Sequence, residues 1–176
     1  MNKASAAIGT TVFFFLAPGL VAGLGPWWVN GWRYASARWD LRPLRWVGAG
    51  LIVVGLTGLI ECFARFAVQG RGTPAPVMPT ETLVVSGLYG YVRNPMYVAV
   101  FAIVAGQGLL LGDGRTMVYA ACVWTAFTLF VVLYEEPTLR RRYGAQYEAY
   151  CAHVRRWLPR LTPWKAEEAR TRRTDG

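Results

Sequence analysis

The sequence predicts an all-α fold, a polytopic membrane helical bundle of about four transmembrane helices with a C-terminal amphipathic cytoplasmic helix. Hydrophobic residues make up 54% of the 176-residue chain, although its formal net charge is +9. Four apolar runs approach the roughly 20 residues that a helix needs to cross a bilayer. None has the polar alternation of a membrane β-barrel. We therefore expect one membrane domain, residues 1–160, followed by a polar, disordered tail over residues 161–176.

The first two runs are Ala6–Leu24 and Trp46–Phe66. The first is expected to span the membrane. A cleavable signal peptide is the alternative, because Lys3 precedes the apolar stretch, but the run is longer than a typical signal-peptide core. Near the end of the second run, Glu61 and Arg65 stand one helical turn apart. They can pair at i,i+4, or they can face a cavity and bind substrate, since intramembrane charges avoid lipid.

The third and fourth runs, Met96–Leu111 and Thr116–Tyr134, are expected to form a helical hairpin, because only Gly112–Arg115 separates them. The hairpin returns its flanking polar segments to one membrane face. One segment is Gly87–Tyr97, and the other begins at Glu135-Glu136-Pro137. An arginine, an asparagine, tyrosines and two carboxylates then meet at one interface. Charges are costly near lipid, so this cluster is the candidate functional site.

The residues after the hairpin predict one amphipathic helix. Between Thr138 and Trp157, apolar residues recur at spacings of three and four, and Pro159 is expected to end the helix. Lying flat on the membrane is the default for this pattern.

The loop Gly70–Pro79 contains three prolines and two glycines. It is either a surface linker or a rim beside Arg93.

Composition excludes several classes of function and suggests a location. The chain has a single histidine, His153, and three scattered cysteines, so we expect no metal. No nucleic-acid recognition module accompanies the basic tail, so membrane lipid is the expected partner and nucleic acid is not.

Lysines and arginines near helix ends are slightly more numerous on the side of the N-terminus, central loop and tail. We therefore expect an integral protein of the plasma membrane, or of the inner membrane if bacterial, with a cytoplasmic C-terminus.

Two motifs in order resemble a known family. The first is Gly87-x-Tyr89 leading into Arg93-Asn94-Pro95-Met96-Tyr97, and the second runs from Glu135-Glu136 through Leu139 to Leu158-Pro159. Together they cover roughly Gly70 to Arg160. The chain thereby resembles the isoprenylcysteine carboxyl methyltransferase family, within a wider group of phospholipid methyltransferase-like membrane methyltransferases. Many members have histidine where this chain has Asn94.

The resemblance implies S-adenosylmethionine as cofactor and a lipophilic small-molecule or lipid acceptor, such as the carboxylate of a prenylcysteine-like molecule. It implies that Glu135 or Glu136 holds the ammonium of the cofactor. Arg93 and Glu136 are the candidate catalytic residues, because Arg93 can hold an acceptor carboxylate bidentately, whereas an amine or thiol acceptor would need Glu136 or Glu61 as a base. Glu61 and Arg65 are the candidate substrate-binding residues. The implied cofactor site, cytoplasmic in location, consists of Tyr89, Arg93, Asn94, Pro95, Met96, Tyr97, Glu135, Glu136, Tyr147 and Tyr150.

Two alternatives remain open. An NADPH-dependent sterol-reductase-like membrane enzyme would use arginines such as Arg140–Arg142 for a ribose phosphate. A non-enzymatic membrane scaffold would explain the helices but would leave the polar cluster without a purpose. The residues do not distinguish O-, N- and S-methylation, nor a prenylcysteine from a phospholipid headgroup.

Overall fold

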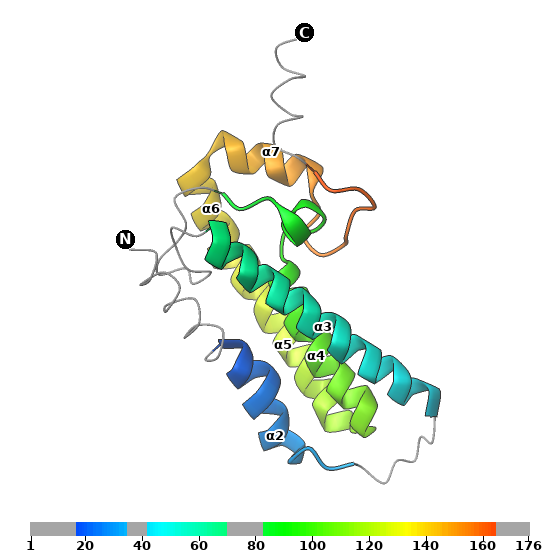
Figure 1. The fold of residues 1–176 in the computed structure, drawn as a ribbon. Coiled ribbons are helices and arrows are strands. Elements are labelled where there is room, and N and C mark those ends of the chain that lie inside the picture. The colour runs from blue at the N-terminus through cyan, green and yellow to red at the C-terminus, as the bar shows by residue number, and fades with distance from the viewer. Residues whose placement is uncertain (1–16, 35–41, 70–82, 165–176) are drawn as a thin grey trace.

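The computed structural model describes residues 17–34, 42–69 and 83–164, and every element in these ranges is helical (Figure 1). The all-α prediction is thereby confirmed. In chain order, the elements are η1 (Leu20–Leu24), α2 (Gly25–Asn30), α3 (Arg42–Gln69), η2 (Gly87–Gly90), α4 (Pro95–Leu111), α5 (Gly114–Phe130), η3 (Val131–Glu135), α6 (Glu136–Tyr143) and α7 (Ala145–His153).

Two stretches, Pro43–Arg65 and Gly114–Tyr143, are long and apolar enough to cross a membrane. The third apolar helix, α4, has 17 residues. The count of about four spanning helices is therefore not confirmed, since the first predicted run is described only from residue 17 onward. Lys3 and the proline-rich loop at residues 70–79 lie outside the described residues.

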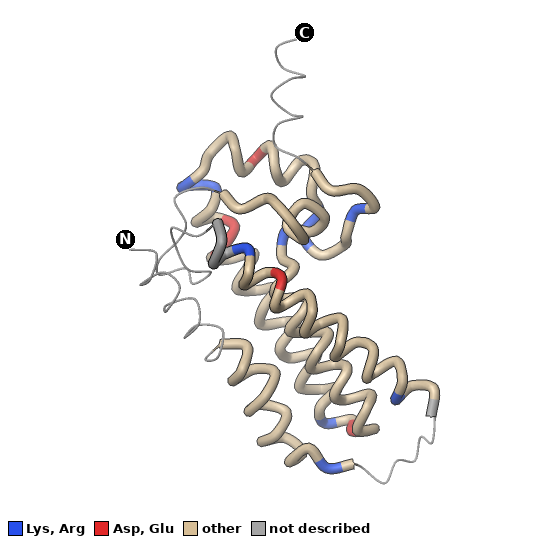
Figure 2. Tube along the Cα trace, in the orientation of Figure 1, with Lys and Arg blue, Asp and Glu red and all other residues tan. Residues whose placement is uncertain are grey.

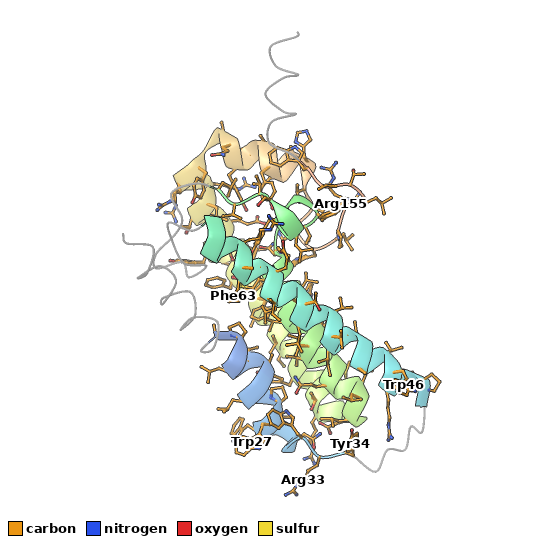
Figure 3. All side chains as sticks on the ribbon, in the orientation of Figure 1. Trp27, Arg33, Tyr34, Trp46, Phe63 and Arg155 are labelled. Atoms are coloured by element: carbon orange, nitrogen blue, oxygen red, sulfur yellow. The ribbon has the colours of Figure 1, made fainter. Side chains whose placement is uncertain are left out.

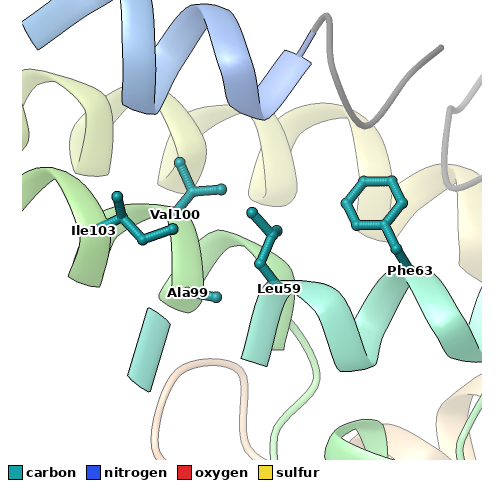
Figure 4. Close-up of a cluster of buried hydrophobic side chains, with 5 residues drawn as sticks. All are labelled: Leu59, Phe63, Ala99, Val100 and Ile103. Carbon is teal, nitrogen blue, oxygen red and sulfur yellow. The ribbon is translucent and has the colours of Figure 1, made fainter. Parts of the chain in front are cut away.

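Helices α3 and α4 pack closely because glycines line their contact. A Cβ atom added to Gly106 of α4 would lie 2.7 Å from the carbonyl oxygen of Gly48 on α3. One added to Gly55 would lie 2.7 Å from the carbonyl oxygen of Ala99. Small residues allow this approach where lipid offers no hydrophobic driving force. Beside them lies a buried cluster (Figure 4), formed by Leu59, Phe63, Ala99, Val100 and Ile103.

The predicted hairpin between α4 and α5 is present, with a tighter turn than expected. Gly112 ends α4 in the left-handed conformation, at φ 66°, which glycine adopts without a steric penalty. The Asp113 carboxylate accepts hydrogen bonds from the Thr116 backbone N–H at 2.9 Å and hydroxyl at 2.7 Å. This N-cap starts α5 at Gly114, two residues earlier than predicted. The two ends of the hairpin consequently return to one end of the bundle.

A π-helical turn precedes Pro26 in the first described helix. Proline has no N–H, so it leaves carbonyl groups one turn earlier without their helical donor. The Val21 carbonyl instead accepts from the Tyr119 hydroxyl at 2.9 Å, and the Ala22 carbonyl accepts from the Gln107 amide at 2.7 Å. These bonds tie η1 to α4 and α5, as expected where a membrane helix is broken by proline.

The prediction of a single tail helix is wrong. The chain forms α6 and α7, separated at Gly144, whose φ of 49° and ψ of −125° interrupt the helix. A residue with a Cβ adopts that conformation only with strain. Helix α7 ends at His153, well before Pro159. The break lets the chain turn back, and Trp164 donates its backbone N–H to the Gly90 carbonyl, so the domain's contacts extend beyond residue 160.

Charged and aromatic side chains lie mainly at the two ends of the helices. Figure 2 shows acidic and basic residues at both ends, with long uncharged stretches of α3 and α5 between them. At the end opposite α6 and α7, Trp27 and Trp46 point outward (Figure 3) and are largely exposed. Exposed tryptophans at helix ends are typical of a membrane interface.

Candidate functional site

The candidate site lies where the hairpin ends meet η2, α7 and the segment that follows α7 (Figure 1). The two polar segments that the sequence expects to share one face are in direct contact. The Arg93 backbone N–H donates to the Arg155 carbonyl at 2.9 Å, and the Arg160 N–H donates to the Tyr91 carbonyl at 2.9 Å. These backbone bonds hold the returning chain against the residues that lead into α4.

Glu136 is the centre of the ionic cluster, and its side chain is only 7% exposed. Its Oε1 atom accepts from Arg93 Nη1 at 3.2 Å and from Arg156 Nε at 2.7 Å, and its Oε2 accepts from Arg156 Nη2 at 2.9 Å. The two bonds from Arg156 form a bidentate pair, and they raise the pKa of that guanidinium. Both carboxylate oxygens of Glu136 are thus occupied by arginines.

Sequence reasoning did not identify Arg156. It stands beside Arg155 after α7, and nothing in the local pattern shows which of the two adjacent arginines turns inward. Cys151 was missed as well, although its Sγ lies 2.9 Å from Arg93 Nη1. The position of α7 brings Cys151 to Arg93, and the path of the chain after α7 brings Arg156 to Glu136.

Glu135 has a different environment, although it is adjacent to Glu136. Its Oε2 accepts from the Tyr97 hydroxyl at 2.7 Å. The Tyr97 ring packs on Phe127 with centroids 4.8 Å apart. The π turn η3 ends at Glu135 and precedes Pro137, and the Glu136 N–H reaches back to Val131. Such π turns are frequent at functional sites, and this one precedes both carboxylates.

The predicted residues Tyr150 and Asn94 donate hydrogen bonds to the backbone of the site. The Tyr150 hydroxyl donates to the Tyr89 carbonyl at 2.6 Å, and the Asn94 side-chain amide donates to the Arg156 carbonyl at 3.2 Å. Burial raises the pKa of Tyr89, Tyr147 and Tyr150 above the ordinary range, so their hydroxyls remain protonated.

Pro95 and Met96 begin α4 rather than join the ionic cluster. Pro95 occupies the first helical position, where its missing N–H costs no hydrogen bond. Met96 packs against the buried cluster between α3 and α4. Their side chains therefore border the site from the direction of the helix core.

Glu61 and Arg65 form the predicted i,i+4 ion pair, with 2.7 Å between Oε1 and Nε. The pair lies against Gly87, whose φ is 63° and where an added Cβ would collide with both side chains. The Glu61–Arg65 pair therefore lies beside η2. It is separate from the ion pairs that Glu136 forms with Arg93 and Arg156. One buried atom of the Glu61–Arg65 pair, Glu61 Oε2, has no hydrogen-bond partner among the described residues, and the same is true of Arg93 Nε.

Comparison with known proteins gives a consistent assignment. Residues 44–146 match the family model described as phospholipid methyltransferase. The chain is 35% identical over 78 residues to protein-S-isoprenylcysteine O-methyltransferase of Schizosaccharomyces pombe, covering 44% of this chain and 33% of the relative. It is 30% identical over 127 residues to the rat (Rattus norvegicus) protein of the same name, covering 68% of this chain and 44% of the relative.

A third relative has a different name. The chain is 27% identical over 129 residues to the nickel-cobalt-cadmium resistance protein NccN of Alcaligenes xylosoxydans xylosoxydans, covering 69% of this chain and 56% of that protein. In all three cases the chain spans between one third and just over half of the relative's length.

Proposed function

Because the chain belongs to the phospholipid methyltransferase family, we propose that it is an integral-membrane methyltransferase that uses S-adenosylmethionine and acts on a lipophilic acceptor. The observation that carries the proposal is the meeting of Arg93, Tyr97, Glu135 and Glu136 at one end of an apolar helix hairpin. Two relatives are named for O-methylation of isoprenylcysteine. A carboxylate on a lipophilic molecule is therefore the acceptor class that we favour.

The donor set suits this cofactor, which carries an ammonium, a carboxylate and a sulfonium. When bound, S-adenosylmethionine supplies an electrophilic methyl group. Arg93 has a buried Nε–H for which the described residues provide no acceptor, and the Glu135 carboxylate, one of whose oxygens accepts from Tyr97, is the acidic group available to an ammonium. Buried polar atoms without partners are uncommon in native proteins and call for an explanation. A zwitterionic ligand beside these two residues would provide one.

Within this proposal, Glu135 binds the ammonium. Glu136 is less suited to that contact because two guanidiniums already occupy both its oxygens. Its role is to orient Arg93 and Arg156 and to keep the returning segment closed over the site. One wall is contributed by Tyr89 of η2 and by the start of α4 with Asn94, Pro95, Met96 and Tyr97. Tyr147 and Tyr150 form the cover contributed by α7.

Arg93 is the residue that we assign to the acceptor carboxylate, which is already a nucleophile at neutral pH. The Glu136 carboxylate accepts from Nη1 of Arg93, and the described residues provide no acceptor for its Nε–H. An acceptor amine or thiol would need a base, and Glu61, with its unpartnered Oε2, suits that role better than Glu136. Glu61 and Arg65 lie beside η2, where they would contact the substrate rather than the cofactor. We place the whole site at the cytoplasmic face.

Calorimetric titration of the detergent-purified protein, with S-adenosylmethionine and with NADPH in parallel, tests the proposal. Saturable binding of S-adenosylmethionine alone is the expected result. Binding of NADPH instead would indicate a reductase. Binding of neither compound by folded, monodisperse protein would favour a scaffold, and either result would overturn the proposal.

A further inference from the structure

The segment from Arg155 to Leu161, which follows α7, exposes two leucines. Leu158 is 63% exposed and Leu161 is fully exposed. Isolated exposed leucines are ordinary on soluble proteins and need no explanation by themselves. The position of these two relative to the membrane-crossing helices therefore decides whether they have a role.

The neighbouring Trp157 fixes that position. Its ring packs on Trp124 of α5, with centroids 4.6 Å apart, and Trp124 packs on Phe101 of α4 at 4.8 Å. Phe101 lies six residues after Pro95, which is about 9 Å along α4 at the usual helical rise. The Trp157 ring thus reaches the level of the apolar helices, so the segment that carries it lies at the edge of the apolar layer.

The segment is held with its leucines outward. Its ends are tied to the chain before α4, since the Arg155 carbonyl accepts from the Arg93 N–H and the Arg160 N–H donates to the Tyr91 carbonyl. Figure 1 shows the orange stretch after α7 turning back toward the helix bundle. Leu158 lies between these two fixed points.

Positive charge flanks the leucines. Arg155 is exposed and lies on the outer side of this stretch in Figure 3. Arg160 donates to the His153 carbonyl at 2.8 Å. Arginine stems can lie along apolar surface while their guanidiniums reach the polar headgroup layer. Leucines at the apolar edge with arginines beside them are complementary to a phospholipid interface.

We propose that Arg155–Leu161 is a membrane-anchoring loop. Leu158 and Leu161 insert into the acyl edge of the bilayer, and Arg155 contacts phospholipid phosphate. The partner is the lipid bilayer itself, so the inference does not depend on the methyl acceptor. The same loop carries Arg156, so insertion would hold the site's ion pair at the membrane surface.

Spin labels in reconstituted protein test the insertion. Cys62, Cys122 and Cys151 are replaced by alanine, and folding is checked by circular dichroism and gel filtration. Single cysteines at Leu158, Leu161 and, as a control, the exposed Gln146 of α7 are then labelled in vesicles of phosphatidylcholine with phosphatidylglycerol. At Leu158 and Leu161 we expect collisions with oxygen to exceed those with a water-soluble nickel chelate, with the reverse at Gln146. Arg155→Glu should reduce the oxygen preference at Leu161.

Two results would overturn the anchoring loop. Nickel-preferring labels at both leucines would place them in water, and labels shielded from both reagents would place them against protein. A crosslinking experiment avoids the thiol replacements. A benzophenone amino acid at Leu161 of the otherwise unchanged chain should yield phospholipid adducts on irradiation, and the same group at Gln146 should not. Adducts at Leu161 to protein alone would contradict the proposal.

Discussion

At the scale of single residues, Glu135 and Glu136 show how neighbours of one type acquire different roles. Both carboxylates follow the same apolar helix, and the sequence pattern treats them as equivalent ligands. In the structure, Glu135 accepts from a tyrosine hydroxyl, whereas Glu136 accepts from three guanidinium N–H groups. The distinction arises because Arg93 and Arg156, which bind Glu136, are 43 and 20 residues away from it in the sequence. No local pattern contains that information.

Glu135→Gln should weaken binding of S-adenosylmethionine. The amide oxygen can still accept from Tyr97, but the charge that attracts an ammonium is lost. A charge-assisted hydrogen bond contributes about 1.5–3 kcal/mol, so we expect affinity to fall at least roughly tenfold. Calorimetry on the folded variant measures this. Glu148→Gln, which neutralises an exposed carboxylate on α7, is the control and should bind as wild type. Unchanged affinity in Glu135→Gln would remove Glu135 from the cofactor site.

Glu136→Ala should act first on stability. It leaves Arg93, only 12% exposed, without its carboxylate partner. Removing one partner of a buried ion pair lowers the free energy of unfolding by about 3–5 kcal/mol. We expect a loss at the lower end of this range, because the Arg156 side chain is 35% exposed. Denaturant unfolding in detergent measures the loss.

The control for Glu136→Ala is Arg140→Gln, which breaks the exposed 3.3 Å pair with Glu148. Exposed pairs contribute at most about 1 kcal/mol. Equal destabilisation by the two variants would show that the Glu136 cluster has no structural role beyond that of a surface ion pair.

At the scale of helices, close packing of α3 on α4 fixes where the hairpin sits. Sequence patterns identify both helices, because apolar run lengths and the Gly-Asp turn are local features. The glycines that face each other are not identified in advance, since Gly48, Gly50 and Gly55 of α3 look alike. Only the crossing of the two helices shows that Gly48 and Gly55 meet α4 while Gly50 meets nothing.

Gly106→Ala should destabilise the protein by about 1–3 kcal/mol, as overpacking of a tight contact does. Its new Cβ would meet the Gly48 carbonyl oxygen at 2.7 Å and Ile52 Cγ1 at 2.8 Å. Gly50→Ala is the matched control, because a Cβ there would have no atom of the described residues within 4 Å. Alanine has the higher helix propensity, so Gly50→Ala should be neutral or stabilising by up to about 1 kcal/mol. Thermal unfolding in detergent compares the two. Similar midpoints would contradict the α3–α4 contact.

At the scale of the molecule, the hairpin separates the α4–α5 turn from the ionic cluster by the length of the apolar helices. One cofactor can contact both polar segments only if they share a membrane face. The structure places the two segments in backbone contact. The side of the membrane on which they lie remains our proposal of a cytoplasmic site.

Accessibility in intact cells tests this orientation. After the native thiols are replaced, single cysteines are placed at Arg115, beside the hairpin turn, and at Gln146 on α7, both of which are exposed. A membrane-impermeant thiol reagent should modify only the Arg115 position, and permeabilised cells should show both. Modification of Gln146 alone would invert the topology. Modification of both in intact cells would contradict a membrane-crossing hairpin.

Sequence patterns alone establish the all-α class, the hairpin and the meeting of two polar segments at one end of it. These features follow from the length of apolar runs and from a turn too short to do anything but reverse the chain. The three-dimensional fold establishes the break at Gly144, the inward turn of Arg156 and the different environments of Glu135 and Glu136. The inward turn of Arg156, and with it the environment of Glu136, depends on where the chain goes after α7, which long-range contacts with Gly90, Tyr91 and Arg93 fix. Local periodicity carries no record of such contacts.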